Sequence, residues 1–403
     1  MATLFLVIIY LAFISLGLPD SLLGVAWPLM RIELGKGLEA AGMVSMVISG
    51  GTILSSLASG YVLKRMNTGM VTFISCFMTA CALLGFSLSP SLFWIILSAI
   101  PLGLGAGSID AGLNHYVATH YKAHHMSWLH CFWGIGATLS PLLMSHLIKT
   151  QGEWRKGYQT VSIIQFVLVL VLFVTLPLWK RDADQEKNAL KADHEVEPHS
   201  LSTQTDKKFS FLSIKGVPLA LLSFLFYCGV ESTMGLWGSS FLMSIKGLSA
   251  ATAAQWVSLY YGGITAGRLI TGFVTMRVSN PVLIRIGQLM TLAGALLIVL
   301  PLPAFFSLIG FILVGLGCAP IFPCMLHETP VRFGKEHSQT IMGLQMALAY
   351  TGSSLLPPLL GWIASATTIG ILPFFVIAYI VIMYGCSEKI NTITREKTTF
   401  LTD

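Results

Sequence analysis

Two acidic residues lie inside long apolar stretches of this sequence, at matching points of its two halves. Asp20 belongs to GLPDSLLGVAW (Gly17–Trp27), and Glu231 belongs to GVESTMGLW (Gly229–Trp237). Each acid is followed four residues later by a glycine, and each stretch ends in a tryptophan. A carboxyl group in an apolar helix is costly to bury, so it usually faces a polar cavity, a partner or a ligand. This placement favours reversible proton binding, or hydrogen bonding to a polar solute.

Both acids also have interpretations that involve structure alone. Asp20 follows Pro19, and its carboxyl group can bond to Ser21 or to a nearby backbone group. Glu231 can form an ion pair with Arg268, a cation placed well inside an apolar stretch, where an unpaired charge is costly. The GRLITG setting of Arg268 also favours a gating or locking contact.

The composition indicates a chain that resides in a lipid bilayer. It has 403 residues, of which 54% are hydrophobic and 10% charged, and its mean hydropathy is +0.76. Soluble domains are usually about 25% charged. Apolar runs long enough to cross a membrane recur from end to end. They predict an all-α membrane protein with twelve transmembrane helices, near residues 3–29, 39–63, 69–88, 92–119, 127–148, 158–179, 214–243, 252–276, 281–301, 304–327, 338–363 and 367–386.

A polar segment divides these spans six and six. It begins KRDADQEKNALKAD at residue 180 and has no apolar periodicity, which is typical of a flexible linker. We therefore predict a six-helix half at 1–180, a cytoplasmic linker at 181–212, and a second six-helix half with a short cytoplasmic tail at 213–403. Lys and Arg concentrate in the connections on one side, which predicts a cell-membrane protein with both termini in the cytoplasm.

The two halves repeat each other in sequence. Gly60 and Arg65, near the end of the second span, match Gly272 and Arg277 near the end of the eighth, both at an offset of 212. Glycine pairs in the fourth and tenth spans, Gly105 with Gly107 and Gly315 with Gly317, match at an offset of 210. Such pseudo-symmetric halves are expected where two helical bundles move against each other around a site near the membrane midplane.

The loop after the second span reads GYVLKRMNTG. Together with twelve spans and a central linker, it resembles the major facilitator superfamily, and the resemblance covers the whole chain. The family's acid four residues after the first glycine is Lys64 here, a departure that affects the conformational lock of this loop. The span-one acid and GLGAGSIDAGLNHYV resemble the fucose:proton symporter group. The segments LHCFWGIGATLSPLL, YCGVE and GRLITG resemble its bacterial glucose/mannose transporter relatives.

The resemblance implies roles for several polar residues. In the fucose group, acids of spans one and four form the pair that couples protons and binds sugar, and Asp20 and Asp110 occupy the matching positions. Glu231 stands where the glucose-type relatives have a glutamate, so it binds hydroxyls or shares the proton. His130 takes the place of a sugar-contacting polar residue of span five. Asn114, one turn after Asp110, suits hydroxyl recognition or an interhelical hydrogen bond, and Asp110 itself alternatively caps a helix contact or pairs with a cation.

Further residues complete the predicted site. Aromatic rings with a polar group suit the mixed surface of a sugar, although such rings also pack helices. The additional candidates for substrate contact are Trp27, Trp237, Tyr260 and Gln345. Trp27 alternatively anchors its helix at the membrane interface. The candidates for gating or structural roles are Gly60, Arg65, Arg268, Gly272 and Arg277.

These residues favour a secondary active transporter that takes up a neutral sugar with a proton by alternating access. A proton-driven drug or metabolite exporter of the same superfamily is the alternative, and a receptor or scaffold on the same fold is the third interpretation. Sodium stays open as the coupling ion. The sequence has no phosphate-binding loop, nucleophile motif or metal-ligand cluster, so we expect no enzyme activity, cofactor or metal. The expected partners are a small sugar, a proton and the bilayer, without nucleic acid, and the chain is expected to be monomeric.

Overall fold

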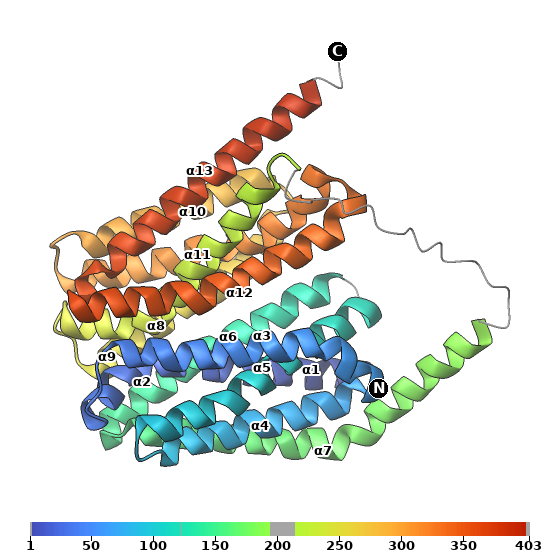
Figure 1. Cartoon of the computed structure of the whole chain (residues 1–403), viewed down its shortest axis with the longest axis horizontal. Helices are drawn as coiled ribbons and strands as arrows, with labels where there is room; N and C mark the ends of the chain where they lie inside the picture. The colour runs from blue at the N-terminus through green and yellow to red at the C-terminus, as the bar shows by residue number, and fades with distance from the viewer. Residues whose placement is uncertain (1, 122, 194–213, 400–403) are drawn as a thin grey trace.

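The computed structural model describes residues 2–121, 123–193 and 214–399, and every regular element in these ranges is helical, as predicted. The first half contains α1 (Ala2–Asp20), α2 (Leu22–Glu33), α3 (Glu39–Arg65), α4 (Thr68–Leu88), α5 (Leu92–His120), α6 (Ala123–Gln151) and α7 (Trp154–Asp193). The second half contains α8 (Val217–Ser244), α9 (Ala250–Val274), α10 (Asn280–Val299), α11 (Ala304–Phe333), α12 (Lys335–Ala366), the short 3₁₀ helix η2 (Ile369–Ile371) and α13 (Leu372–Thr399). The helices of the two halves form two bundles that lie side by side (Figure 1).

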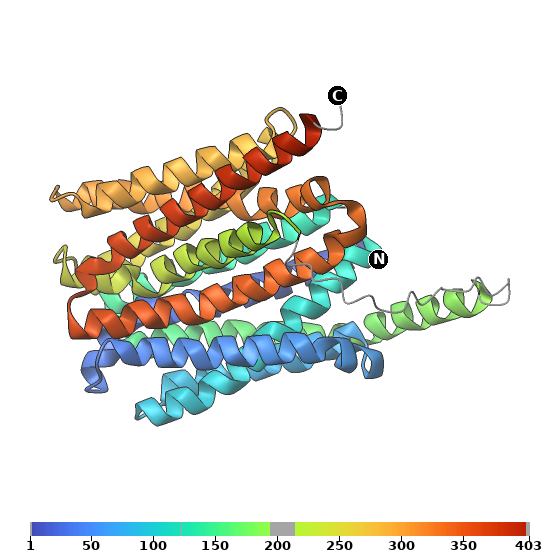
Figure 2. The ribbon, with the colours of Figure 1, turned by 45° about the horizontal axis from the view of Figure 1, so that its top comes forward.

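Among the described residues, ten segments are long and apolar enough to cross a membrane, and α1 with α2 forms one of them, Phe5–Glu33. The two remaining predicted spans correspond to α9 and α12, which are less apolar. Both helices pack against the other half, α9 on α6 and α12 on α3 (Figure 1, Figure 2). Much of their surface therefore faces protein rather than lipid, which accounts for their higher content of polar residues.

The predicted linker begins later than the sequence indicated. α7 continues beyond residue 180 through Asp193, so the expectation of an irregular chain at 181–193 is wrong. This stretch, RDADQEKNALKAD, contains neither proline nor glycine and is rich in strong helix formers, so the helix persists after the apolar run ends. The rest of the predicted linker, 194–212, lies outside the described residues.

The first span is broken beside its acid. α1 ends at Asp20 and α2 begins at Leu22. Pro19 has no N–H to donate to the carbonyl of Ser15, four residues earlier. That carbonyl instead accepts a hydrogen bond of 2.7 Å from the side chain of Gln165 in α7. The break therefore leaves no unpaired carbonyl at Ser15. It also ends α1 at the residue that carries the acid, Asp20.

The internal repeat in the sequence is a repeat of helix contacts. A side chain at Gly103 of α5 would collide with the carbonyl oxygen of Ile48 in α3. A side chain at Gly315 of α11 would collide in the same way with the carbonyl oxygen of Tyr260 in α9. Both members of the second pair follow those of the first by 212 residues. The matched glycines therefore permit equivalent close helix crossings, and the two pseudo-symmetric halves are confirmed.

The two halves meet at one end of the molecule. Gly24 of α2 lies against the backbone of Gly235 in α8, and Gly42 of α3 lies against Pro358 of α12. Nearer the other end of the same two helices, a side chain at Gly50 of α3 or Gly343 of α12 would meet nothing within 4 Å. The closed end is opposite the end at which α1 begins and α13 finishes (Figure 1).

Candidate functional site

Asp20 is solvent-accessible, although it lies near the middle of the apolar segment Phe5–Glu33. Its Oδ2 atom accepts a hydrogen bond of 2.7 Å from the indole Nε1–H of Trp133 in α6. Ser21 is not its partner, because the Ser21 hydroxyl donates instead to the carbonyl of Ala137 at 3.0 Å. The carboxylate is therefore accessible to solvent, and one neutral donor holds it.

Trp133 connects this acid to the other half of the molecule. The guanidinium carbon of Arg268, in α9, lies 5.2 Å from the centre of the Trp133 ring, within the range of a cation–π contact. Arg268 Nη2 also lies 3.5 Å from Oε1 of Glu231 in α8. The result is a continuous series of contacts from Asp20 through Trp133 and Arg268 to Glu231, which crosses from one half to the other.

A second polar group surrounds Asp110 in α5. Its Oδ1 accepts from the Asn114 side-chain amide at 2.8 Å, and its Oδ2 accepts from the Tyr350 hydroxyl of α12 at 2.9 Å. Asp110 and Glu231 both lie within electrostatic range of Asp20. The structure thus brings three intramembrane acids from both halves into one region.

The part of the chain that the structure describes has two repeated halves of long helices with acids between them, an arrangement that can be compared with known families. The family model described as Major Facilitator Superfamily matches residues 9–357. The chain belongs to this superfamily. It is therefore a membrane transporter and not an enzyme, as the sequence indicated.

The resemblance to glucose/mannose transporters is also confirmed. The chain is 24% identical over 393 residues to the glucose/mannose transporter of Bacillus subtilis strain 168, covering 95% of this chain and 93% of that protein. It is 22% identical to the sodium-dependent glucose transporter 1A of Mus musculus, covering 94% and 91%. The solved D-xylose-proton symporter superposes with a TM-score of 0.72 at 13% identity, covering 94% of this chain and 96% of that one. This last comparison supports the superfamily fold.

Three predicted aromatic contacts of this transporter are packing residues in the structure. Trp27 and Trp237 are fully buried in the core. The Trp237 indole donates to the carbonyl of Pro357 at 2.7 Å, whereas the Trp27 N–H has no hydrogen-bond partner among the described residues. Tyr260 is also fully buried, and its hydroxyl donates to the backbone carbonyl of Glu231 at 3.1 Å. These side chains pack the helices that carry the acids and are not accessible to solvent.

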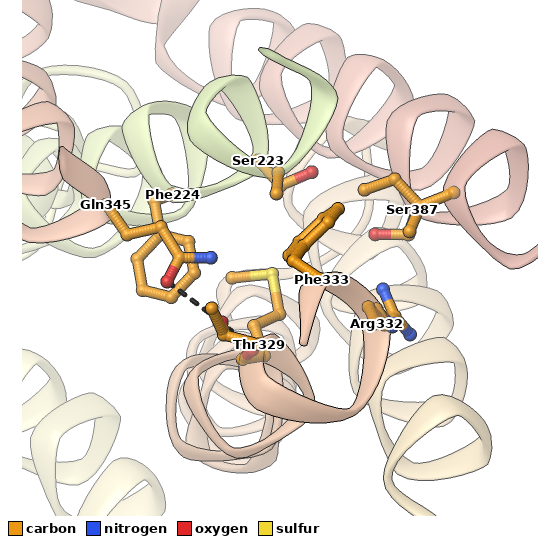
Figure 3. A pocket seen from close by; sticks show the side chains of 10 residues that line it. Ser223, Phe224, Thr329, Arg332, Phe333, Gln345 and Ser387 are labelled. Carbon is orange, nitrogen blue, oxygen red and sulfur yellow. Dashed lines mark hydrogen bonds between the residues drawn. The ribbon is translucent and has the colours of Figure 1, made fainter. Parts of the chain in front are cut away.

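His130 and Gln345 lie in different surroundings. His130 is half-buried, packs edge-on against Phe13 with ring centres 5.9 Å apart, and lies within electrostatic range of Arg268. Gln345 is buried in the second half, where it accepts a hydrogen bond of 2.9 Å from Thr329. It lines a narrow pocket with Ser223, Arg332 and Ser387 (Figure 3). His130 therefore lies near Arg268, and Gln345 belongs to a separate pocket.

Two of the predicted gating residues are arginines at matching places, Arg65 at the end of α3 and Arg277 just after α9. Arg65 stacks over the ring of Tyr61 at 4.3 Å and, like Arg277, forms no ion pair among the described residues. Gly272 faces open space, and Gly60 lies within α3.

Two other ion pairs lie within the second half. Arg285 pairs with Glu388 at 2.6 Å, and Arg332 pairs with Glu328 at 3.1 Å. Sequence reasoning missed these pairs, because Glu328 and Glu388 lie among polar residues just beyond the ends of the predicted spans and have no acid at the matching points of the first half.

Sequence reasoning also left Trp133 and Tyr350 outside the site. Trp133 had a detectable signal, since it follows His130 by one helical turn and so shares its face. Tyr350 had none, because it lies in α12 among small and apolar residues, 240 positions away from its partner Asp110.

Proposed function

We propose that this transporter takes up a neutral sugar together with a proton. The observation that supports the proposal is the contact series from Asp20 through Trp133 and Arg268 to Glu231, with Asp110 nearby. It provides carboxylates that bind protons and hydroxyls, and N–H groups that donate to oxygen. The relatives named for glucose, mannose and xylose transport support the substrate class.

The charges favour a neutral solute. Asp20, Asp110 and Glu231 carry carboxylates, and Arg268 is the cation that lies among them. An anionic solute would meet more negative than positive charge. A sugar has hydroxyl groups that both donate to carboxylates and accept from N–H groups, so it matches this mixture without adding charge. We propose that Asp20, Asp110, Asn114, His130, Trp133, Glu231 and Arg268 form the substrate site.

The proposed cycle follows from the arrangement of the halves. If both termini are cytoplasmic, as the distribution of Lys and Arg favours, the contacts of Gly24 and Gly42 close the outer side, and the acids face the cytoplasm. A proton and a sugar bind when the outer side is open, and both leave on the inner side. Protonation changes the balance between these arrangements only through a difference in affinity between them. Proton binding at Asp20 satisfies this condition because its partner Trp133 lies at the contact between the halves.

The test is flux in proteoliposomes that contain the purified chain. Radiolabelled glucose, mannose, galactose and xylose are offered separately, under a pH gradient and under a sodium gradient with no pH difference. We expect accumulation of at least one sugar driven by the pH gradient. Accumulation driven by sodium alone would replace the proton as coupling ion. If no sugar exchanges across the membrane while the protein extrudes drugs or metabolites against a proton gradient, the exporter alternative is correct.

A further inference from the structure

Tyr350 forms a hydrogen bond that links the two halves directly, and its acceptor is an intramembrane acid. Its hydroxyl lies on α12, in the second half, and donates to Asp110 Oδ2 of α5, in the first half, at 2.9 Å. Other polar contacts between the halves, such as Ser145 to the carbonyl of Ala251 and Ser258 to the carbonyl of Thr138, end on neutral acceptors. Among the side-chain hydrogen bonds between the halves that involve described residues, the bond from Tyr350 is the one whose acceptor can change charge.

The surroundings of Asp110 leave this bond without an ionic alternative. Among the described residues, no Lys or Arg pairs with Asp110. The titratable groups that face it are Tyr350 from α12 and Asp20 from α1, and its own helix supplies Asn114. Ser56 of α3 and Cys228 of α8 adjoin the Tyr350 side of the contact.

The two hydrogen-bond donors to Asp110 respond differently when the two halves move apart. Asn114 lies on the same helix as Asp110, so its hydrogen bond moves with α5 when the halves rearrange. Tyr350 lies on the other half, so its hydrogen bond must break if α12 moves away from α5. A hydrogen bond to a charged acceptor is about twice as strong as one between neutral groups.

We propose that Tyr350 couples the charge of Asp110 to the packing of the two halves. When Asp110 is ionised, the hydroxyl holds α12 against α5. When Asp110 binds a proton, the bond weakens and the two helices separate more readily. The proposal deepens the proposed function and rests on it for the source of the proton, but the contact and its response to charge can be measured without a substrate.

The experiment measures the distance between α3 and α12 at the open end of the molecule. Spin labels are placed at Leu57→Cys, which is exposed on α3, and at Gly343→Cys, where α12 has space for a side chain. Accessible native cysteines are replaced in the full-length chain. Distance distributions are recorded at several pH values in the parent, in Tyr350→Phe, in Asp110→Asn and in the double variant. Tyr379→Phe is the matched control, because it removes a buried hydroxyl that has no hydrogen-bond partner among the described residues.

In the parent, the distance distribution should contain a population with α3 and α12 close together and one with them apart. The ratio of these two populations should change with pH. Loss of one hydrogen bond to a charged group corresponds to roughly a tenfold to hundredfold change in such a ratio. Tyr350→Phe and Asp110→Asn should each reduce the pH response to the same residual level, which Asp20 supplies. The double variant should equal either single variant, and Tyr379→Phe should equal the parent.

A full pH response in Tyr350→Phe would overturn the proposal, and so would additive effects in the double variant. Failure of the proposed function would look different, because the parent would then transport no sugar while its distance distributions still answered this question. Size-exclusion profiles of the isosteric variants establish that each measurement is made on a folded chain.

Discussion

Asp20 and Glu231 occupy equivalent places in the two halves, but their surroundings differ. Asp20 is accessible to solvent, and its partner is the neutral N–H of Trp133. Glu231 has a side chain only 16% exposed, and its partner is the cation of Arg268. Protonation of Asp20 leaves no cation unpaired, whereas protonation of Glu231 removes the ionic partner of Arg268. The repeat therefore supplies two acids, and their partners divide them into one suited to proton exchange and one suited to holding a fixed charge.

The largest effect is expected from the ionic side of this comparison. Arg268→Gln leaves Glu231 as an uncompensated charge in a nearly buried position, which costs about 3 kcal/mol. The double variant Glu231→Gln with Arg268→Gln removes both charges and should recover much of that loss. Thermal unfolding of the purified protein in detergent measures both. Equal losses of stability in the single and double variants would show that Arg268 stabilises the protein by a contact other than its ion pair with Glu231.

Asp20→Asn breaks the comparison on the other side. The amide retains the shape of the side chain but binds no proton, so accumulation driven by a pH gradient should fail while sugar exchange at equal concentrations persists. A pH difference of one unit coupled to one proton supports roughly tenfold accumulation, which sets the size of the loss. Glu231→Gln is the matched variant, and its remaining uptake should still respond to the pH gradient. If Glu231→Gln loses the pH response and Asp20→Asn keeps it, the two roles are reversed.

Trp133→Phe tests the link between the two acids. Phenylalanine keeps a ring beneath Arg268 but removes the N–H that bonds to Asp20, so apparent sugar affinity should fall by about 1 kcal/mol, or roughly fivefold. Trp133→Leu also removes the cation–π contact and should cost about 0.5 kcal/mol more. Concentration dependence of exchange in proteoliposomes gives both values. Identical results for the two variants would mean that the ring contributes nothing to the link.

The smallest effect is expected from Tyr227→Phe. The Tyr227 hydroxyl is buried close enough to Glu231 and Arg268 to interact with both, but it forms no well-aligned hydrogen bond with a described residue. Its removal should change unfolding stability and sugar exchange by less than about 0.5 kcal/mol. A larger effect would show that Glu231 depends on this hydroxyl as well as on Arg268, which would narrow the difference between the two acids.

The sequence predicted much of the fold because its signals are local. Apolar length identified the helices, and glycines at matched offsets identified the repeat, since close backbone contact requires a missing side chain on one helix. The same local signals missed the extension of α7 through Asp193, where helix propensity rather than hydropathy sets the boundary. They also placed Gln345 near the acids, although it lines a pocket within the second half.

By itself, the sequence determined that this chain spans a membrane in two repeated halves and that it carries acids where acids are costly. The cost of a charge in an apolar helix depends on composition, which is legible along the chain. The tertiary structure alone decided the partner of each acid. Trp133 lies 113 residues from Asp20, and Tyr350 lies 240 residues from Asp110. Such contacts depend on how each helix is rotated and tilted against its neighbours, and the packing of the whole bundle sets those angles.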